Sequence, residues 1–244
     1  MNHGDDAHEP IAPGPIITVP GQLSLPTCTV VPPIKGLRAE REGLLPDMAG
    51  WHKGDLLLFR AEGPTGALIE RVQRAKWGDD GRWSHVAMYV GEGMAVEAIL
   101  GKPPRMIGVK EQSLASYSPH REMLRLHDRE LDEAARDLLV RTVRKISGTY
   151  SIPRLIAAGF WGVIPASLRP ERDAHERVER YRGGVRAVRA YICSDVIEAA
   201  YSETIEESAA PSATEGIVPP AAFAASPRFD RHAVTLCRLV GAPS

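Results

Sequence analysis

The chain has 244 residues, of which 43% are hydrophobic, a size that suits one globular domain with an extension better than two full domains. Its 30 Lys and Arg residues are balanced by 31 Asp and Glu, so the formal net charge of −1 argues against a general nucleic-acid binder. The longest nearly apolar stretch, residues 155–168, is shorter than the roughly 20 residues that a membrane-spanning helix needs. We therefore expect no membrane span and no nucleic-acid partner.

Residues 1–48 are predicted to form a proline-rich N-terminal arm outside the folded domain. Prolines recur from Pro10 to Pro46, and each one removes a backbone donor and fixes φ. Two alternatives follow: an extended arm that lies along the domain surface through residues such as Ile16 and Val30, or a flexible tail. The segment carries no pattern of a secretory signal, so the default expectation is a cytoplasmic protein, with export by a non-Sec route left open.

Residues 49–244 are predicted to form the folded domain. The pattern predicts, in chain order, a strand at 55–59, a helix at 67–76, a turn at 78–81, strands at 83–90, 94–100 and 122–127, and a helix at 130–147. Beyond these it predicts a buried helix at 155–168, a helix at 193–202, a loop at 211–220 and a closing strand at 233–240. The two strands that flank 91–93 are expected to form a hairpin. The stretch 169–189 is dense in arginine and acidic residues, which is typical of a solvated surface.

The cysteines, histidines and glycines give no pattern for a disulfide framework, a metal or a nucleotide. Cys28, Cys193 and Cys237 are few and far apart, and no pair has zinc spacing. Reduced thiols are therefore expected, with Cys28 and Cys237 as small buried hydrophobes. The glycines at 91 and 93 lack the third glycine of a dinucleotide loop, and no metalloprotease motif is present. The sequence predicts no cofactor and no metal.

His85 and Glu97 are predicted to lie on the same face of the hairpin. Alternation along the strand separates His85 and Ala87 from apolar neighbours such as Val86. Glu97 follows twelve residues later, which puts it directly opposite His85 or one diagonal away. A carboxylate there can fix the imidazole tautomer and leave the other ring nitrogen to act as a base; an ordinary cross-strand ion pair is the alternative. Ala87 and Ala95 are expected to leave room on this face for a helix.

Cys193 is the candidate nucleophile. It lies at or near the N-terminus of the helix predicted at 193–202, where the helix dipole and free amide groups favour a thiolate. Its backbone N–H is then a candidate donor to an oxyanion. Asp195 is expected to stabilise the helix start. The alternative interpretation of Cys193 is a small buried hydrophobe.

Five segments that contain these residues occur in a recognisable order. They are 54–59 (GDLLLF), 84–91 (SHVAMYVG), 96–98 (VEA), 148–150 (GTY) and 191–195 (YICSD). Together they resemble the permuted papain-like cysteine hydrolases, the YiiX/YebB-like branch of the NlpC-type superfamily. The resemblance runs from about Trp51 to Val240, and 218–227 is similar to the closing loop and short helix of that family. In papain-like enzymes the cysteine comes first, whereas here His85 and Glu97 precede Cys193, as the permuted branch requires.

The resemblance implies an α+β, circularly permuted papain-like fold, in which an antiparallel sheet packs against helices and the cysteine begins a helix. It further implies a cysteine hydrolase of the amidase or endopeptidase kind, with Cys193, His85 and Glu97 as catalytic residues. Tyr191 and Asp55 are additional candidates for oxyanion or substrate binding. The expected substrate is an amide bond in a peptidoglycan or related peptide. The stretch 169–189 is longer than the family connection before the cysteine, and is a candidate lid or substrate contact.

Other functions stay open at this stage. A related branch that includes lecithin:retinol acyltransferase acts on lipid esters through the same Cys and His, and residues 155–168 would suit a lipid chain as well as a core helix. A non-catalytic binding module that keeps the fold is a third possibility. Delivery as an antibacterial effector, with the arm as a docking segment, would reconcile a cell-wall substrate with the lack of a Sec pattern. Neither a delivery partner nor an inhibitor partner is identified by the sequence.

Overall fold

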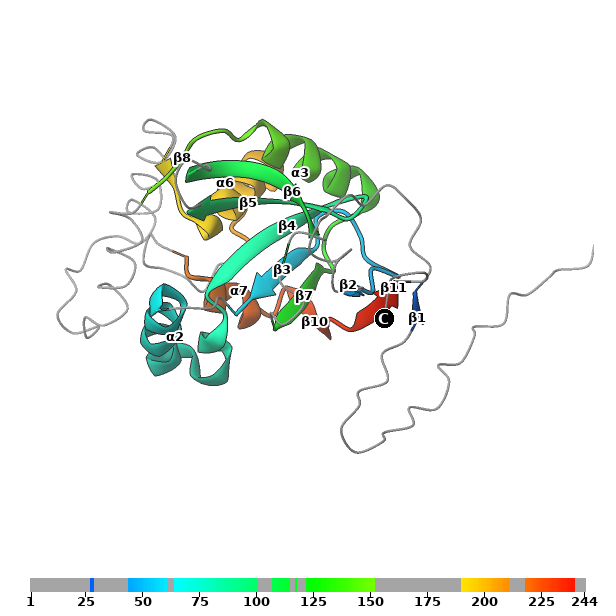
Figure 1. The fold of residues 1–244 in the computed structure, drawn as a ribbon. Helices are drawn as coiled ribbons and strands as arrows, with labels where there is room; N and C mark the ends of the chain where they lie inside the picture. The colour runs from blue at the N-terminus through cyan, green and yellow to red at the C-terminus, as the bar shows by residue number, and fades with distance from the viewer. Residues whose placement is uncertain are drawn as a thin grey trace, which may run out of the picture.

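The computed structural model describes residues 27–28, 44–60, 64–100, 107–114, 117, 122–151, 190–210 and 218–239. These residues form a six-stranded antiparallel sheet with helices packed on one face (Figure 1). The architecture is therefore a mixture of antiparallel sheet and a few helices, as in α+β proteins. The predicted segments 155–168 and 169–189, and most of the proline-rich arm, lie outside the described residues.

The main sheet has the strand order β10-β7-β3-β4-β5-β6. Its strands are β3 (Leu56–Phe59), β4 (His85–Gly91), β5 (Met94–Leu100), β6 (Ile107–Ser113), β7 (Met123–Asp128) and β10 (Phe229–Ala233). A three-stranded sheet has the order β1-β11-β2, formed by β1 (Thr27–Cys28), β11 (Leu236–Leu239) and β2 (Leu44–Pro46). A short parallel pair joins β8 (Thr149–Tyr150) to β9 (Ala190–Tyr191).

The described helices are α2 (Pro64–Trp77), the 3-10 helix η1 (Gly78–Arg82), α3 (Glu133–Lys145), α6 (Cys193–Ile205) and α7 (Pro220–Ala224). The first turn of α3 is capped by Asp132, whose carboxylate accepts a hydrogen bond of 2.7 Å from the Ala135 N–H. None of the helices among the described residues combines the length and the apolar character needed to cross a bilayer.

The expected strands at 55–59, 83–90, 94–100 and 122–127, their hairpin, and the helix starting at 193 are confirmed within a few residues. Six strands were not predicted: the short strands β1, β2, β8 and β9, and two strands of the main sheet, β6 and β10. β6 carries four polar residues in succession, Lys110–Ser113, and β10 is exposed over most of its length, so neither has the apolar pattern of a buried strand. The expected turn at 78–81 is a 3-10 helix, and the closing strand is shorter, with β10 before it.

Both faces of β4 are buried. The larger core lies between the sheet and the helices, and it joins Val86 and Met88 of β4 to Val140 of α3, Val196 of α6 and Phe223 of α7. A smaller core on the other face contains Leu57, Phe59, Ala87, Ala95, Leu114 and Tyr117.

The prediction that a helix would approach over Ala87 and Ala95 is wrong. α6 packs instead on the face of Val86 and Met88, whereas the face of the two alanines is filled by other side chains, Tyr117 among them. The physical reason is that a helix removes more apolar area from water against Val and Met side chains than against alanine.

Two short pieces of the predicted arm pair with the closing strand. β1 runs parallel to β11, and β2 runs antiparallel to it. The Asp47 N–H extends the second pairing with a hydrogen bond of 2.7 Å to the carbonyl oxygen of Thr235. These backbone contacts attach residues 27–28 and 44–47 to the C-terminal part of the fold.

The expectation of reduced thiols throughout the chain is wrong for Cys237. Cys237, on β11, is disulfide-bonded, whereas Cys193 is free and buried. Sequence spacing could not indicate this bond, because the two ends of the chain approach each other only through the pairing of β1 with β11.

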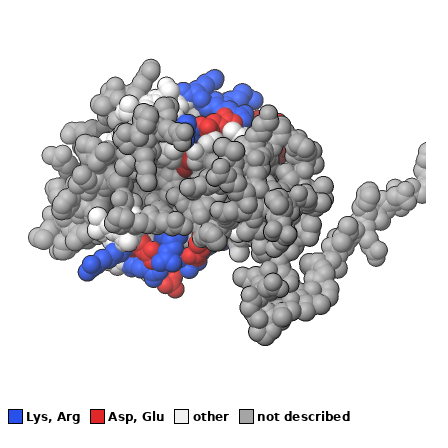
Figure 2. Space-filling model, viewed as in Figure 1, with Lys and Arg blue, Asp and Glu red and all other residues white. Residues whose placement is uncertain are grey.

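The described charges on the visible face are locally balanced. Figure 2 shows basic and acidic side chains intermingled in two patches, near α3 and near α2. Near α3, Arg144 pairs with Glu111, and near α2, Glu70 pairs with both Arg60 and Arg74. Exposed pairs of this kind contribute little to stability.

Candidate active site

Cys193 is the first residue of α6. The helix begins after Ile192, whose backbone is extended and whose N–H donates a hydrogen bond of 2.9 Å to the Asp195 carboxylate. Asp195 therefore stabilises the helix start, as expected. The N–H groups of a first helical turn have no acceptor within the helix, so the Cys193 amide belongs to the group that can bind an anion. The Cys193 side chain is only 5% exposed.

His85 and Glu97 are in direct contact. In the hairpin, Met88 pairs with Val96 and Tyr89 with Ala95, a register that continues to put Glu97 one diagonal from His85. The His85 Nε2 makes a short hydrogen bond to the Glu97 carboxylate. Glu97 is almost completely buried, and its second carboxylate oxygen accepts a hydrogen bond from the side-chain amide of Gln112 on β6. Both Glu97 oxygens thus have partners, as a buried charge requires.

The imidazole of His85 also contacts Cys193, and this contact affects the pKa of His85. Burial by itself lowers the pKa of His85, but the negative charges of Cys193 and Glu97 and the hydrogen bonds to both raise it to about 10. Since Nε2 faces Glu97, the other ring nitrogen is left for the thiol. The His85 side chain is therefore an imidazolium at neutral pH.

Aromatic side chains lie beside the imidazole of His85. The Phe59 ring lies 5.9 Å from the His85 ring, measured between centroids, and Phe59 itself stacks on Tyr117 at 4.7 Å. Phe59 is also the partner of His85 in the pairing of β3 with β4. These contacts restrict the orientation of the ring, which an acid–base group needs.

Tyr150 is a further side chain at the site. β8 and β9 pair so that Tyr150 lies beside Tyr191, two residues before Cys193. Burial, together with the negative charges of Cys193 and Asp195, raises the pKa of Tyr150. Its hydroxyl therefore stays protonated and can donate a hydrogen bond near the thiol.

Tyr191 does not present an open binding surface. Its side chain is buried in the larger core, and its carbonyl oxygen accepts a hydrogen bond of 2.9 Å from the Ser151 N–H. Tyr191 therefore belongs to the short β8–β9 pairing, which leads into the helix that begins at Cys193.

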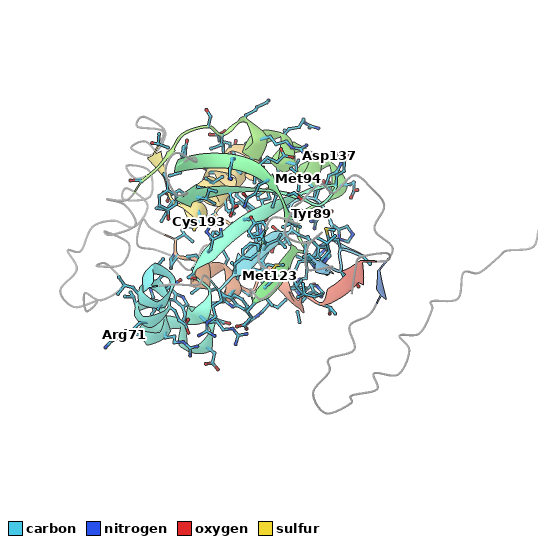
Figure 3. All side chains as sticks on the ribbon, in the orientation of Figure 1. Arg71, Tyr89, Met94, Met123, Asp137 and Cys193 are labelled. Carbon is cyan, nitrogen blue, oxygen red and sulfur yellow. The ribbon has the colours of Figure 1, made fainter. Side chains whose placement is uncertain are left out.

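Asp55 does not lie near Cys193, His85 and Glu97. Its carbonyl oxygen accepts a hydrogen bond from the Tyr89 N–H, four residues along β4 from His85. Four residues of strand span roughly 13 Å at about 3.3 Å per residue. Figure 3 shows Tyr89 and Cys193 toward opposite ends of β4. The carboxylate of Asp55 is fully buried and bound to Arg125, His127 and Arg136, so its contacts are those of a structural ion-pair network.

Asp55 belongs to the one group of close metal-ligating side chains found in the described part of the chain, with His52 and His127. The charges around it do not favour a cation. Arg125 lies 2.9 Å and Arg136 3.4 Å from the Asp55 carboxylate oxygens, so two guanidinium groups already compensate its single charge. A divalent ion would meet both of them at short range. We therefore assign no metal to this cluster.

Sequence reasoning missed two polar residues of the site. Gln112 lies in β6, a strand that was not predicted, and no pattern in the adjacent sequence links it to Glu97. Tyr150 lies in the segment 148–150, which contributed to the family resemblance without a role for any of its side chains. Its position near Cys193 depends on the pairing of β8 with β9, which joins residues 41 apart in the chain.

Comparisons with known proteins leave the family open. No protein-family model matches the chain, and no curated protein is significantly similar to it in sequence.

Proposed function

We propose that this protein is a cysteine hydrolase with a permuted papain-like arrangement, which cleaves an amide bond in a cell-wall peptide or a related peptide. The observation that carries the proposal is the position of His85, which contacts both the thiol at the start of α6 and the buried carboxylate of Glu97. A thiol, an imidazole and a carboxylate linked in this order form the constellation of nucleophile, acid–base group and orienting group. The order of these residues in the chain and the resemblance support the permuted branch.

In the proposed reaction, the Cys193 sulfur attacks the carbonyl carbon after its proton has moved to His85. The C–N bond then breaks, and the His85 imidazolium gives its proton to the leaving amine. Water next attacks the thioester and loses a proton to His85, which releases the carboxylic acid and regenerates the thiol pair. Glu97 holds the imidazole in position and stabilises its positive charge throughout.

Two groups are suited to stabilise the negative oxygen that forms during the attack. The first is the Cys193 N–H at the helix start, and the second is the Tyr150 hydroxyl. Tyr150→Phe removes only the hydroxyl and is expected to lower kcat about a hundredfold, because one oxyanion donor is lost. Steady-state kinetics on the cleaved substrate measures the effect.

The matched control for Tyr150 is Tyr201→Phe. Tyr201 is also buried, but its hydroxyl donates to Asp128, away from the thiol. This variant is expected to lose stability and keep kcat. Equal losses of kcat in both variants would contradict a specific role for Tyr150.

Glu97→Gln keeps the shape of the side chain and removes its charge. We expect kcat/KM to fall roughly 10- to 100-fold, since a hydrogen bond to a charged group contributes about 1.5–3 kcal/mol. The basic limb of the pH profile should move to lower pH, because one of the two anions that raise the pKa of His85 is lost. Glu111→Gln on the neighbouring strand, where Glu111 pairs with Arg144 at the surface, should change neither quantity. An unshifted limb in Glu97→Gln would argue against the assigned role.

The substrate is tested by incubating the purified protein, in parallel, with peptidoglycan fragments and with a phospholipid mixture, followed by mass spectrometry of the products. A sample whose thiol has been alkylated serves as the inactive reference. New amine and carboxyl ends in the peptides would support an amidase and identify the bond. Released fatty acid or transferred acyl groups would replace the proposal by a lipid esterase or acyltransferase, and product formation by the alkylated sample would refute a thiol mechanism.

A further inference from the structure

Cys237 and Cys193 are in different chemical states. Cys237 lies on β11, is 1% exposed and takes part in a disulfide, whereas Cys193 is a free thiol. The chain contains three cysteines. Since Cys193 is free, Cys28 is the one residue in the sequence that can complete the bond to Cys237.

We propose that a Cys28–Cys237 disulfide fastens the N-terminal arm to the closing strand, and that the folded protein is suited to an oxidising compartment. The backbone pairing supports this connection. Thr27 pairs with Arg238 and Cys28 with Leu239 in the parallel ladder of β1 and β11. Leu239 and Cys237 are two residues apart on one strand and so lie on the same face, which makes Cys237 the diagonal neighbour of Cys28.

The bond adds to a small set of contacts that hold the arm. The β1–β11 ladder is only two residue pairs long, and β2 adds three more pairs on the other side of β11. Such short strands are marginal by themselves. A disulfide between residues at the two ends of the chain closes a loop that contains nearly the whole domain. The restriction that it places on the unfolded chain increases with loop length, so this bond is a strong constraint.

The formation of the bond requires an oxidant. The thiols of Cys28 and Cys237 lose two protons and two electrons, and a disulfide-containing partner such as oxidised glutathione is reduced to two thiols. Disulfides form and persist outside the reducing cytoplasm. This inference does not depend on the proposed hydrolase activity, although an extracytoplasmic location agrees with a cell-wall substrate. It replaces the default expectation of a cytoplasmic protein.

The first test maps the thiols of the full chain. The protein is equilibrated with a mainly oxidised glutathione mixture, quenched in acid, unfolded, and labelled with N-ethylmaleimide before peptide mapping by mass spectrometry. We expect the peptides of Cys28 and Cys237 to be joined, while Cys193 carries a label or a glutathione. Labels on both Cys28 and Cys237, or a bond from either of them to Cys193, would overturn the assignment.

The second test measures Tm with and without dithiothreitol. Reduction should lower the Tm of the wild type by several degrees. Cys28→Ser should start at the reduced value and show no response to dithiothreitol, whereas Cys193→Ser, the matched control, should respond as the wild type does. Equal Tm values for the oxidised and reduced wild type would overturn the inference that the fold is suited to an oxidising compartment, and a response in Cys28→Ser would overturn Cys28 as the partner.

Discussion

Replacing Cys193 by alanine is expected to lower the rate of amide hydrolysis by at least about 10⁴-fold, to the limit of detection in the product assay. The sulfur of Cys193 forms the covalent bond of the acyl-enzyme, and no other free cysteine is found among the described residues. Water attacking directly would have to reach the carbonyl without covalent catalysis, although the oxyanion donors and the substrate contacts would be retained. The measurement is the initial rate of product formation by mass spectrometry, at equal enzyme concentrations.

The folded state of the alanine variant has to be checked at the same time. Cys193 is buried in the larger core at the start of α6, so the variant should show the same far-UV circular dichroism as the wild type and a small change in Tm. A second signature separates a nucleophile from a structural thiol. The wild type should accumulate a covalent acyl adduct on the peptide that contains Cys193 when the reaction is quenched early. Full turnover by the alanine variant would refute the proposed mechanism.

The pH profile of the wild type is expected to keep a high rate up to about pH 10 and to fall above it. His85 must be an imidazolium in order to protonate the leaving amine, and its pKa is raised to about 10 by Cys193 and Glu97 in spite of its burial. The profile of kcat/KM reports on the free enzyme, which is the state described by the structure. A basic limb near pH 6.5, the ordinary value for histidine, would contradict the ion pair at the site.

The same raised pKa links stability to pH. A His85 pKa above its unfolded value near 6.5 means that the folded protein binds this proton more tightly than the unfolded chain does. The contribution to stability is therefore complete below pH 6.5 and is lost as the pH rises to about 10. Urea unfolding of the wild type and of His85→Gln, measured between pH 6 and pH 10, should show the larger pH-dependent loss in the wild type. His85→Gln should also lower turnover by about 10³-fold, because the acid–base group is gone. Parallel pH dependences of the two proteins would contradict the linkage.

Local patterns predicted the central part of the fold correctly. The run of apolar residues at 56–59, the alternation from His85 to Val90, and the glycines at 91 and 93 specify a strand and a hairpin through properties of neighbouring residues. The position of the turn limits the hairpin register, so the sequence placed Glu97 on the face of His85, directly opposite it or one diagonal away, and the observed position is the diagonal one. A helix starting at Cys193 was predicted for the same reason, because helix starts are encoded within one turn.

Features that depend on residues far apart in the chain could not be predicted in this way. The sequence placed Asp55 among the candidate binding residues, but the pairing of β3 with β7 and the packing of α3 surround it with Arg125, His127 and Arg136. The face of β4 on which α6 packs was predicted wrongly, since both faces are apolar enough to be buried and only the global packing selects one.

The sequence alone determined the residue types at the candidate site, the strand and helix starts that carry them, and the sheet face that Glu97 shares with His85. These properties depend on turns, alternation and capping, which act over a few residues. The tertiary structure decided that Cys193 meets His85, that Gln112 and Tyr150 join them, and that Cys237 is disulfide-bonded. Those contacts join segments separated by tens to hundreds of residues, and the free energy that selects them comes from burial of the whole core rather than from any local pattern.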